Sequence, residues 1–115
     1  MCRTSDVSLD MRFVVTLPAS RQEARMSART RSAWKAFTAF SERHELQHRS
    51  IYLECGRSIV RQVNAARSSS CSQLRREVWQ ILSAAKRTCE AKQSAFDRAE
   101  RHSLANLSLF RLGRR

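Results

Sequence analysis

The sequence predicts a mainly α-helical protein: an antiparallel helical hairpin preceded by a single N-terminal β-strand or extended arm. Two glycines and one proline in 115 residues are too few for a turn-rich β-sandwich or barrel. Apolar residues recur with a helical period after residue 20, whereas strict alternation is confined to residues 7–17. A chain of this length buries about two-thirds of its surface on folding, so one modest core is expected.

The alternating segment, residues 7–17, ends at Pro18 and lies in an arm that we assign to residues 1–19. A lone strand cannot satisfy its own backbone hydrogen-bonding groups. We therefore expect it to pair with the C-terminal segment, a second copy or the edge of another protein's sheet. The pairing face would carry Leu9, Met11, Phe13 and Val15. The alternative is an extended arm that lies on a surface.

Helical periodicity predicts a first helix over residues 20–67 and a second over about 72–110. Ser20 and Glu23 have the spacing of a capping box, and no glycine follows until Gly56, where a kink is allowed. Two helices meeting near residues 48–50 are the alternative. The serine-rich stretch 68–72 predicts the turn, and Ser70-x-x-Gln73 predicts the second start. Both helices would form one basic domain, residues 20–115, with facing apolar stripes.

The net charge of +12 favours a polyanionic neighbour, such as RNA, an anionic lipid surface or an acidic protein. Most basic residues of the second helix lie opposite its apolar stripe, and one tryptophan lies among them. A second tryptophan lies at the edge of the first helix's stripe. Tryptophan and arginine together suit RNA stacking or a protein interface. The residues predicted to contact a partner are Arg75, Arg76, Trp79, Lys86, Arg87, Arg98, Arg101 and Trp34.

The four cysteines contain no Cys-x-x-Cys pair, which argues against a zinc site built on thiolates. We interpret them as buried free thiols. Cys55 and Cys89 stand at comparable distances from the predicted turn. A disulfide between the two helices at these positions is therefore the alternative.

His44 and His48 have the spacing that places two metal ligands on one helical face. Nearby in the sequence only Glu45 could join them, and the helical wheel directs it elsewhere. His44 lies in the apolar stripe, so we interpret it as a hydrogen-bonded core or interface histidine. A hairpin offers no pocket to place a nucleophile and its base. The sequence therefore predicts no catalytic residue, no metal and no cofactor.

These observations predict a non-catalytic accessory subunit of a large multi-subunit assembly, with other protein subunits as partners. The Arg-rich, amphipathic segment 20–41 is typical of mitochondrial import signals, which predicts a mitochondrial respiratory, ATP synthase or ribosomal complex. Otherwise an intracellular location is expected, because the N-terminus lacks the apolar core of a secretory signal. No apolar run reaches the length of a membrane span. The alternative function is RNA binding through the Arg-rich face of the second helix.

Overall fold

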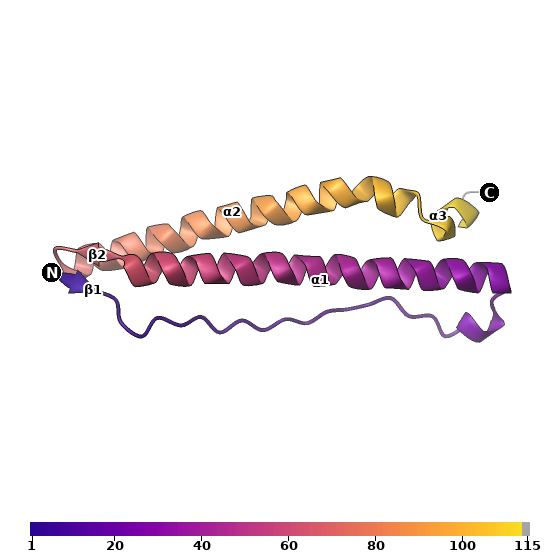
Figure 1. The fold of residues 1–115 in the computed structure, drawn as a ribbon, viewed down its shortest axis with the longest axis horizontal. Coiled ribbons are helices and arrows are strands. Elements are labelled where there is room, and N and C mark those ends of the chain that lie inside the picture. Colours follow the sequence, from indigo (N-terminus) through magenta and orange to yellow (C-terminus); the bar gives the residue numbers. More distant parts are fainter. Residues whose placement is uncertain (114–115) are drawn as a thin grey trace. The chain divides into compact units, whose positions relative to one another are not determined.

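The computed structural model describes residues 1–113, so the last two residues of the predicted domain lie outside the described part. Two long helices joined by a short linker confirm the predicted helical hairpin (Figure 1). The elements in chain order are β1 (Cys2–Arg3), the 3-10 helix η1 (Glu23–Arg25), α1 (Ala28–Ala65), β2 (Arg67–Ser68), α2 (Cys71–Ala105) and α3 (Ser108–Gly113).

Helix α1 begins later than the sequence predicted because another serine caps it. The Oγ atom of Ser27 accepts a hydrogen bond from the Thr30 amide at 3.1 Å, as an N-cap does. Ser20 instead accepts a hydrogen bond from the Gln22 amide within a local turn. From Ala28 the helix runs without a break to Ala65. The alternative of two helices that meet near residues 48–50 is therefore wrong.

The start of α2 follows the predicted cap, whereas its end does not. Ser70 Oγ accepts a hydrogen bond from the Gln73 amide at 3.2 Å. The helix ends at Ala105, and the Asn106 side chain bonds to the His102 ring at 2.9 Å. The remaining apolar residues form α3, so the continuous helix predicted to about residue 110 is interrupted.

Residues 7–17 form no strand, and the strand interpretation of this segment is wrong. Its alternating side chains pack on α1 instead. A Cβ atom added to Gly56 would lie 2.6 Å from Met11 Sδ and 3.2 Å from Leu9 Cδ2, and the Phe13 ring lies 6.2 Å from Tyr52. Alternation places every second side chain on one side, and a helix can supply the apolar surface without a sheet edge. The alternative of an extended arm describes this segment.

The only β structure among residues 1–113 is a short antiparallel pairing of β1 with β2. Cys2 lies opposite Ser68, and Arg3 lies opposite Arg67. Next to this pair, the Thr4 hydroxyl donates a hydrogen bond of 2.7 Å to the Val63 carbonyl. The start of the chain is thus held at the linker between the two long helices.

The chain divides into two compact units. The first, here called the disulfide unit, contains Met1–Phe13 and Arg49–Ser94, and the second, the histidine unit, contains Val14–His48 and Ala95–Arg115. Val63, Leu74 and Cys89 are buried in the disulfide unit, and Ala33 is buried in the histidine unit. No large side chain of residues 1–113 is completely withdrawn from solvent. Each unit therefore has a thin core.

All four cysteines are paired, so the prediction of free thiols is wrong. Cys55 joins Cys89 between α1 and α2, as the sequence alternative allowed, and Cys2 joins Cys71. The second bond depends on the pairing of β1 with β2, which brings the start of the chain to the start of α2. Both bonds lie in the disulfide unit.

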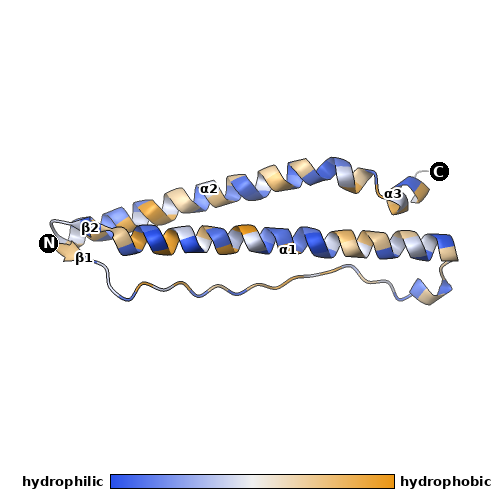
Figure 2. Ribbon diagram, in the orientation of Figure 1, coloured by the Kyte–Doolittle hydropathy of each residue, from blue (hydrophilic) through white to orange (hydrophobic). Residues whose placement is uncertain are grey.

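Apolar and polar residues are mixed along both long helices (Figure 2). Within residues 1–113, no helix combines the length and the apolar character that a membrane span requires.

Candidate metal centre

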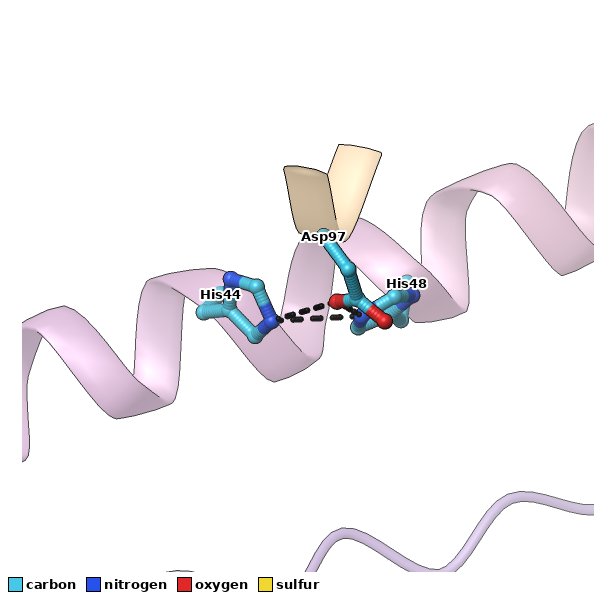
Figure 3. A group of neighbouring side chains, drawn as sticks. All are labelled: His44, His48 and Asp97. Atoms are coloured by element: carbon cyan, nitrogen blue, oxygen red, sulfur yellow. Dashed lines mark hydrogen bonds and ion pairs between the residues drawn. The ribbon is translucent and has the colours of Figure 1, made fainter. Parts of the chain in front are cut away.

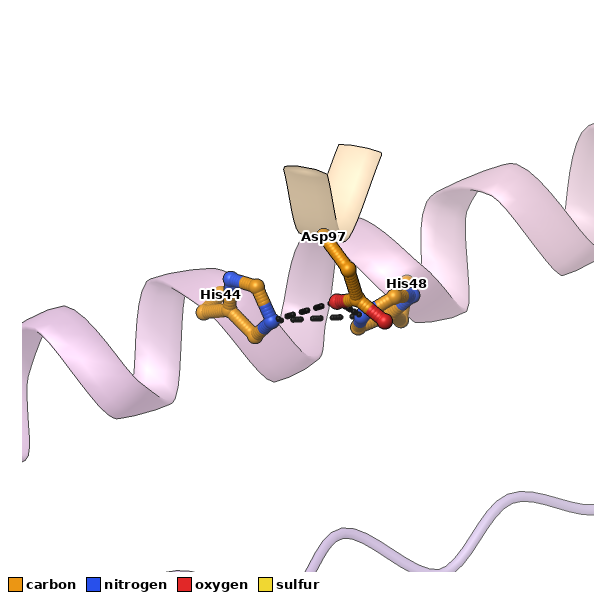
Figure 4. Close-up of polar contacts among 3 residues, drawn as sticks. All are labelled: His44, His48 and Asp97. Carbon is orange, nitrogen blue, oxygen red and sulfur yellow. Dashed lines mark hydrogen bonds and ion pairs between the residues drawn. The ribbon is translucent and has the colours of Figure 1, made fainter. Parts of the chain in front are cut away.

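Three side chains converge in the histidine unit: His44 and His48 from α1, and Asp97 from α2 (Figure 3). The two histidines are one helical turn apart and therefore share a face. Asp97 Oδ1 lies 2.6 Å from His48 Nε2 and 3.0 Å from His44 Nε2, and the two Nε2 atoms are 3.2 Å apart (Figure 4). Two nitrogens and one oxygen thus form a small triangle.

The triangle of donor atoms also suits a metal ion. If both Nε2 atoms donated to the same oxygen, two protons would crowd the space between nitrogens that are only 3.2 Å apart. Tetrahedral zinc, with bonds of about 2.0–2.1 Å, separates its ligand atoms by about 3.3 Å. Of the three separations, 3.0 and 3.2 Å are near this value, whereas the 2.6 Å between His48 Nε2 and Asp97 Oδ1 is that of a short hydrogen bond. Two neutral imidazoles and a carboxylate therefore form a donor set that fits zinc, and three protein ligands are typical of catalytic zinc sites.

Aromatic rings fix the orientation of both imidazoles. Phe96 stacks on His44 with ring centroids 4.7 Å apart and meets His48 edge-on at 5.0 Å. Phe40 lies nearly parallel to His44 at 6.0 Å. His44 Nδ1 is buried and has no hydrogen-bond partner among residues 1–113. Ring contacts orient the His44 imidazole, and among residues 1–113 its Nδ1 lacks the hydrogen-bond acceptor that a metal-bound histidine usually has.

The Asp97 carboxylate is held in its ionised form. Burial raises the pKa of this group, but the hydrogen bonds of His48 and its charge when the ring is protonated, followed by those of His44, lower it, and the net pKa is below its usual value. In the neutral form that binds a metal, the two imidazoles do not supply this charge. Since metal ligands must be deprotonated, an ionised Asp97 is prepared to bind a cation.

Glu45 lies in the wall of the same hollow as His44 and Asp97. This site hollow has a volume of about 390 Å³ and is also lined by Phe37, Phe40, Ser41, Glu100, Arg101 and Leu104. Glu45 follows His44 by about 100° around the helix, and the hollow is wide enough to include both. Glu45 thus lines the hollow without belonging to the three groups that converge.

The signal that the sequence interpretation missed is His44-Glu45-x-x-His48. On a helix this motif places two histidines on one zinc ion and supplies a glutamate as general base, as in metallopeptidases. The sequence interpretation considered the two histidines as a pair and did not treat Glu45 as part of the same motif. Asp97 is 49 residues from His48, and only the fold shows that it joins the pair.

The predicted partner-binding residues that lie on α2 are exposed. Trp79 is 65% exposed, whereas Trp34 is half-buried with its ring 5.6 Å from Phe37. Of the predicted set, only Arg101 lines the site hollow. The remaining exposed members are Arg75, Arg76, Lys86, Arg87 and Arg98. Their contact with a partner stays a prediction.

The fold and the site together define a helical-hairpin protein with a His-Glu-x-x-His motif completed by an aspartate. The chain belongs to the family described as bacterial protein of unknown function (DUF922), whose family model matches residues 1–103. All three converging side chains lie within the matched residues. No curated protein and no solved structure matches the chain.

The family corrects the predicted location. Because it is bacterial, the mitochondrial location and the membership of a mitochondrial multi-subunit complex are wrong. Within the Arg-rich segment that suggested import, Arg31 has a structural role, since it donates hydrogen bonds to the carbonyls of Glu23, Ala24 and Met26 before and at the start of α1.

Proposed function

We propose that this protein is a zinc-dependent peptidase in which His44, His48 and Asp97 hold the metal and Glu45 is the general base. One observation carries the proposal: three ligand atoms 2.6–3.2 Å apart lie beside the glutamate of a His-Glu-x-x-His helix. His44, Glu45 and Asp97 line the same hollow, which supports access of a ligand to these three residues.

When bound, zinc would supply Lewis-acid chemistry, polarising the substrate carbonyl and acidifying water. Glu45 accepts a proton from the attacking water and returns it to the amine nitrogen that leaves. His44 and His48 present their Nε2 lone pairs, with both rings held by Phe96. Asp97 remains ionised and supplies the negative charge of the ligand set.

The two disulfides support an oxidising location for this bacterial protein. Disulfides persist in the periplasm and outside the cell but are rare in the cytoplasm. This differs from the intracellular location that the sequence predicted, and it would place the peptidase among extracytoplasmic proteins.

The proposal is tested by zinc binding and peptide cleavage in two variants. We expect the protein to bind one zinc per chain, and His48→Ala to weaken binding at least a hundredfold, measured by competition with a chromophoric chelator. Glu45→Gln should retain zinc but lose about a hundredfold to ten-thousandfold in the cleavage rate of a peptide library, because the general base is removed. Glu42→Gln, an exposed change one turn earlier, is the matched control. Full cleavage by Glu45→Gln, or zinc affinity unchanged in His48→Ala, would contradict the proposal.

The non-catalytic and RNA-binding functions predicted from the sequence stay predictions. The exposure of Trp79 beside exposed Arg75 and Arg76 supports contact with another macromolecule. Trp79→Ala distinguishes the two functions, because it should weaken single-stranded RNA binding if the base-stacking interpretation is right. It should leave zinc binding and peptide cleavage unchanged.

A further inference from the structure

The site hollow has one apolar wall that the proposed zinc chemistry does not use. Phe37, Phe40 and Leu104 form this wall, and Leu104 is 37% exposed. The volume of about 390 Å³ lies within the range of pockets that bind small molecules, about 300–1,000 Å³. An apolar wall that remains accessible to solvent is suited to an apolar group of a ligand.

The aromatic part of this wall is held in place by other rings. Phe37 lies between Trp34, at 5.6 Å, and Phe110 of α3, which meets it edge-on at 5.5 Å. Phe40 lies parallel to the imidazole of His44. The apolar surface therefore begins at His44, a candidate metal ligand, and extends along α1 to Phe37, whose ring contacts both Trp34 and Phe110.

Arg101 adds a polar group to the same hollow. It is one helical turn beyond Asp97 on α2, so both side chains lie on one face. Arg101 forms no ion pair with any of residues 1–113, although Asp97 and Glu100 are close in sequence. Its guanidinium donors are therefore available to a carbonyl or carboxylate oxygen of a ligand.

We propose, on the basis of the proposed peptidase function, that the hollow is a substrate subsite for a large apolar side chain next to the bond that is cut. Phe37, Phe40 and Leu104 contact that side chain, and Arg101 binds a backbone carbonyl or terminal carboxylate oxygen of the same substrate residue. The substrate class is thus peptides with leucine, phenylalanine or a similar residue at this position.

The test measures peptide binding without cleavage, in the Glu45→Gln variant, both metal-free and loaded with zinc. The probes are acetyl-Gly-Phe-amide and acetyl-Gly-Ala-amide, titrated by calorimetry. We expect the phenylalanine peptide to bind about tenfold to two-hundredfold more tightly, as apolar pockets discriminate between side chains that differ in size. Adding Leu104→Ser should reduce this preference at least threefold, and Leu17→Ser, a similarly exposed position outside the hollow, should not change it.

Arg101→Gln separates the polar contact from the apolar one. It should weaken both peptides by a similar factor of about five to ten, whereas Arg98→Gln, outside the hollow, should have no effect. Repeating the titration with acetyl-Gly-Phe carrying a free carboxylate distinguishes the two oxygen sources: a larger loss in Arg101→Gln indicates the carboxylate, and an equal loss indicates the carbonyl.

The possible outcomes distinguish failure of the subsite proposal from failure of the peptidase proposal. Equal affinity for the two peptides, in both metal-free and zinc-loaded protein, would overturn the subsite even if the wild-type chain binds zinc and cleaves peptides. A preserved preference for phenylalanine in a chain that binds no zinc would overturn the peptidase and leave an apolar binding site.

Discussion

Each of the two units of this protein contains a different kind of interaction between side chains. The disulfide unit contains all four cysteines, paired in two bonds, and the histidine unit contains the three polar side chains that converge. Cross-links stabilise a thin core by restricting the unfolded chain, and they need no ligand. The His44–His48–Asp97 triangle crowds polar atoms, and a cation would relieve that crowding. The comparison teaches that the cross-links and the candidate metal site occupy different parts of one short chain.

Removing one disulfide bond should cause the largest expected change, a decrease in the free energy of unfolding. Cys55→Ala with Cys89→Ala opens a loop of 34 residues, for which chain entropy gives a loss of about 4 kcal/mol in the free energy of unfolding. Urea denaturation followed by circular dichroism measures this loss. Reductant added to the double variant should destabilise it further, through the bond between Cys2 and Cys71. Identical urea midpoints for oxidised and reduced wild-type protein would show that the cross-links do not stabilise the disulfide unit.

Changing the ring that orients the histidines should have a smaller effect, confined to metal binding. Phe96→Leu removes contacts to both imidazoles, and we expect zinc affinity to fall about tenfold, as when second-shell partners of metal ligands are lost. Phe96→Tyr should restore most of the affinity because the ring remains. The visible spectrum of the cobalt-substituted protein should also broaden in the leucine variant. Phe110→Leu is the control, and equal zinc affinities for the Phe96→Leu and control variants would refute this positioning role.

The smallest expected effect is the loss of stability when the Asp97 carboxylate is protonated at low pH. The pKa of Asp97 is lowered by its histidine partners, so its contribution to stability is complete above the unfolded pKa, near 3.9, and is lost as the pH falls through the lower folded value. The effect is small because the side chain is 56% exposed and solvent screens the pair. Melting curves of metal-free wild-type and Asp97→Asn protein at several pH values between 2 and 6 measure it. A difference between the two proteins that is independent of pH would count against the ionised carboxylate.

Most of the helical structure could be predicted from local signals, and the errors have local causes. The cap at the start of α2 was predicted correctly because Ser70 and Gln73 have the spacing of a capping box. At the first helix two serines compete, and the sequence does not show that Ser27 caps α1 while Ser20 forms a turn. The alternation over residues 7–17 is real, but period two describes any extended segment with one packed face.

Only part of the candidate site could be predicted from the sequence. The two histidines and Glu45 are adjacent in the chain, and their motif could have been recognised. Asp97 and Phe96 come from the other long helix, so their contact depends on the register of the hairpin, which composition and periodicity do not determine. The same limit applies to Cys2 and Cys71, whose bond needs the short pairing of β1 with β2.

The bond between Cys2 and Cys71 also changes what a break in the backbone would do. The segment after Phe13 has no helix or strand until Glu23, and Val14 is 93% exposed, so it is accessible to endopeptidases. A cut there would leave the N-terminal piece attached through Cys71 to the rest of the chain. The nicked protein would migrate as one species in a non-reducing gel and as two in a reducing gel. Such a cut would thus add one water to the mass and release no fragment.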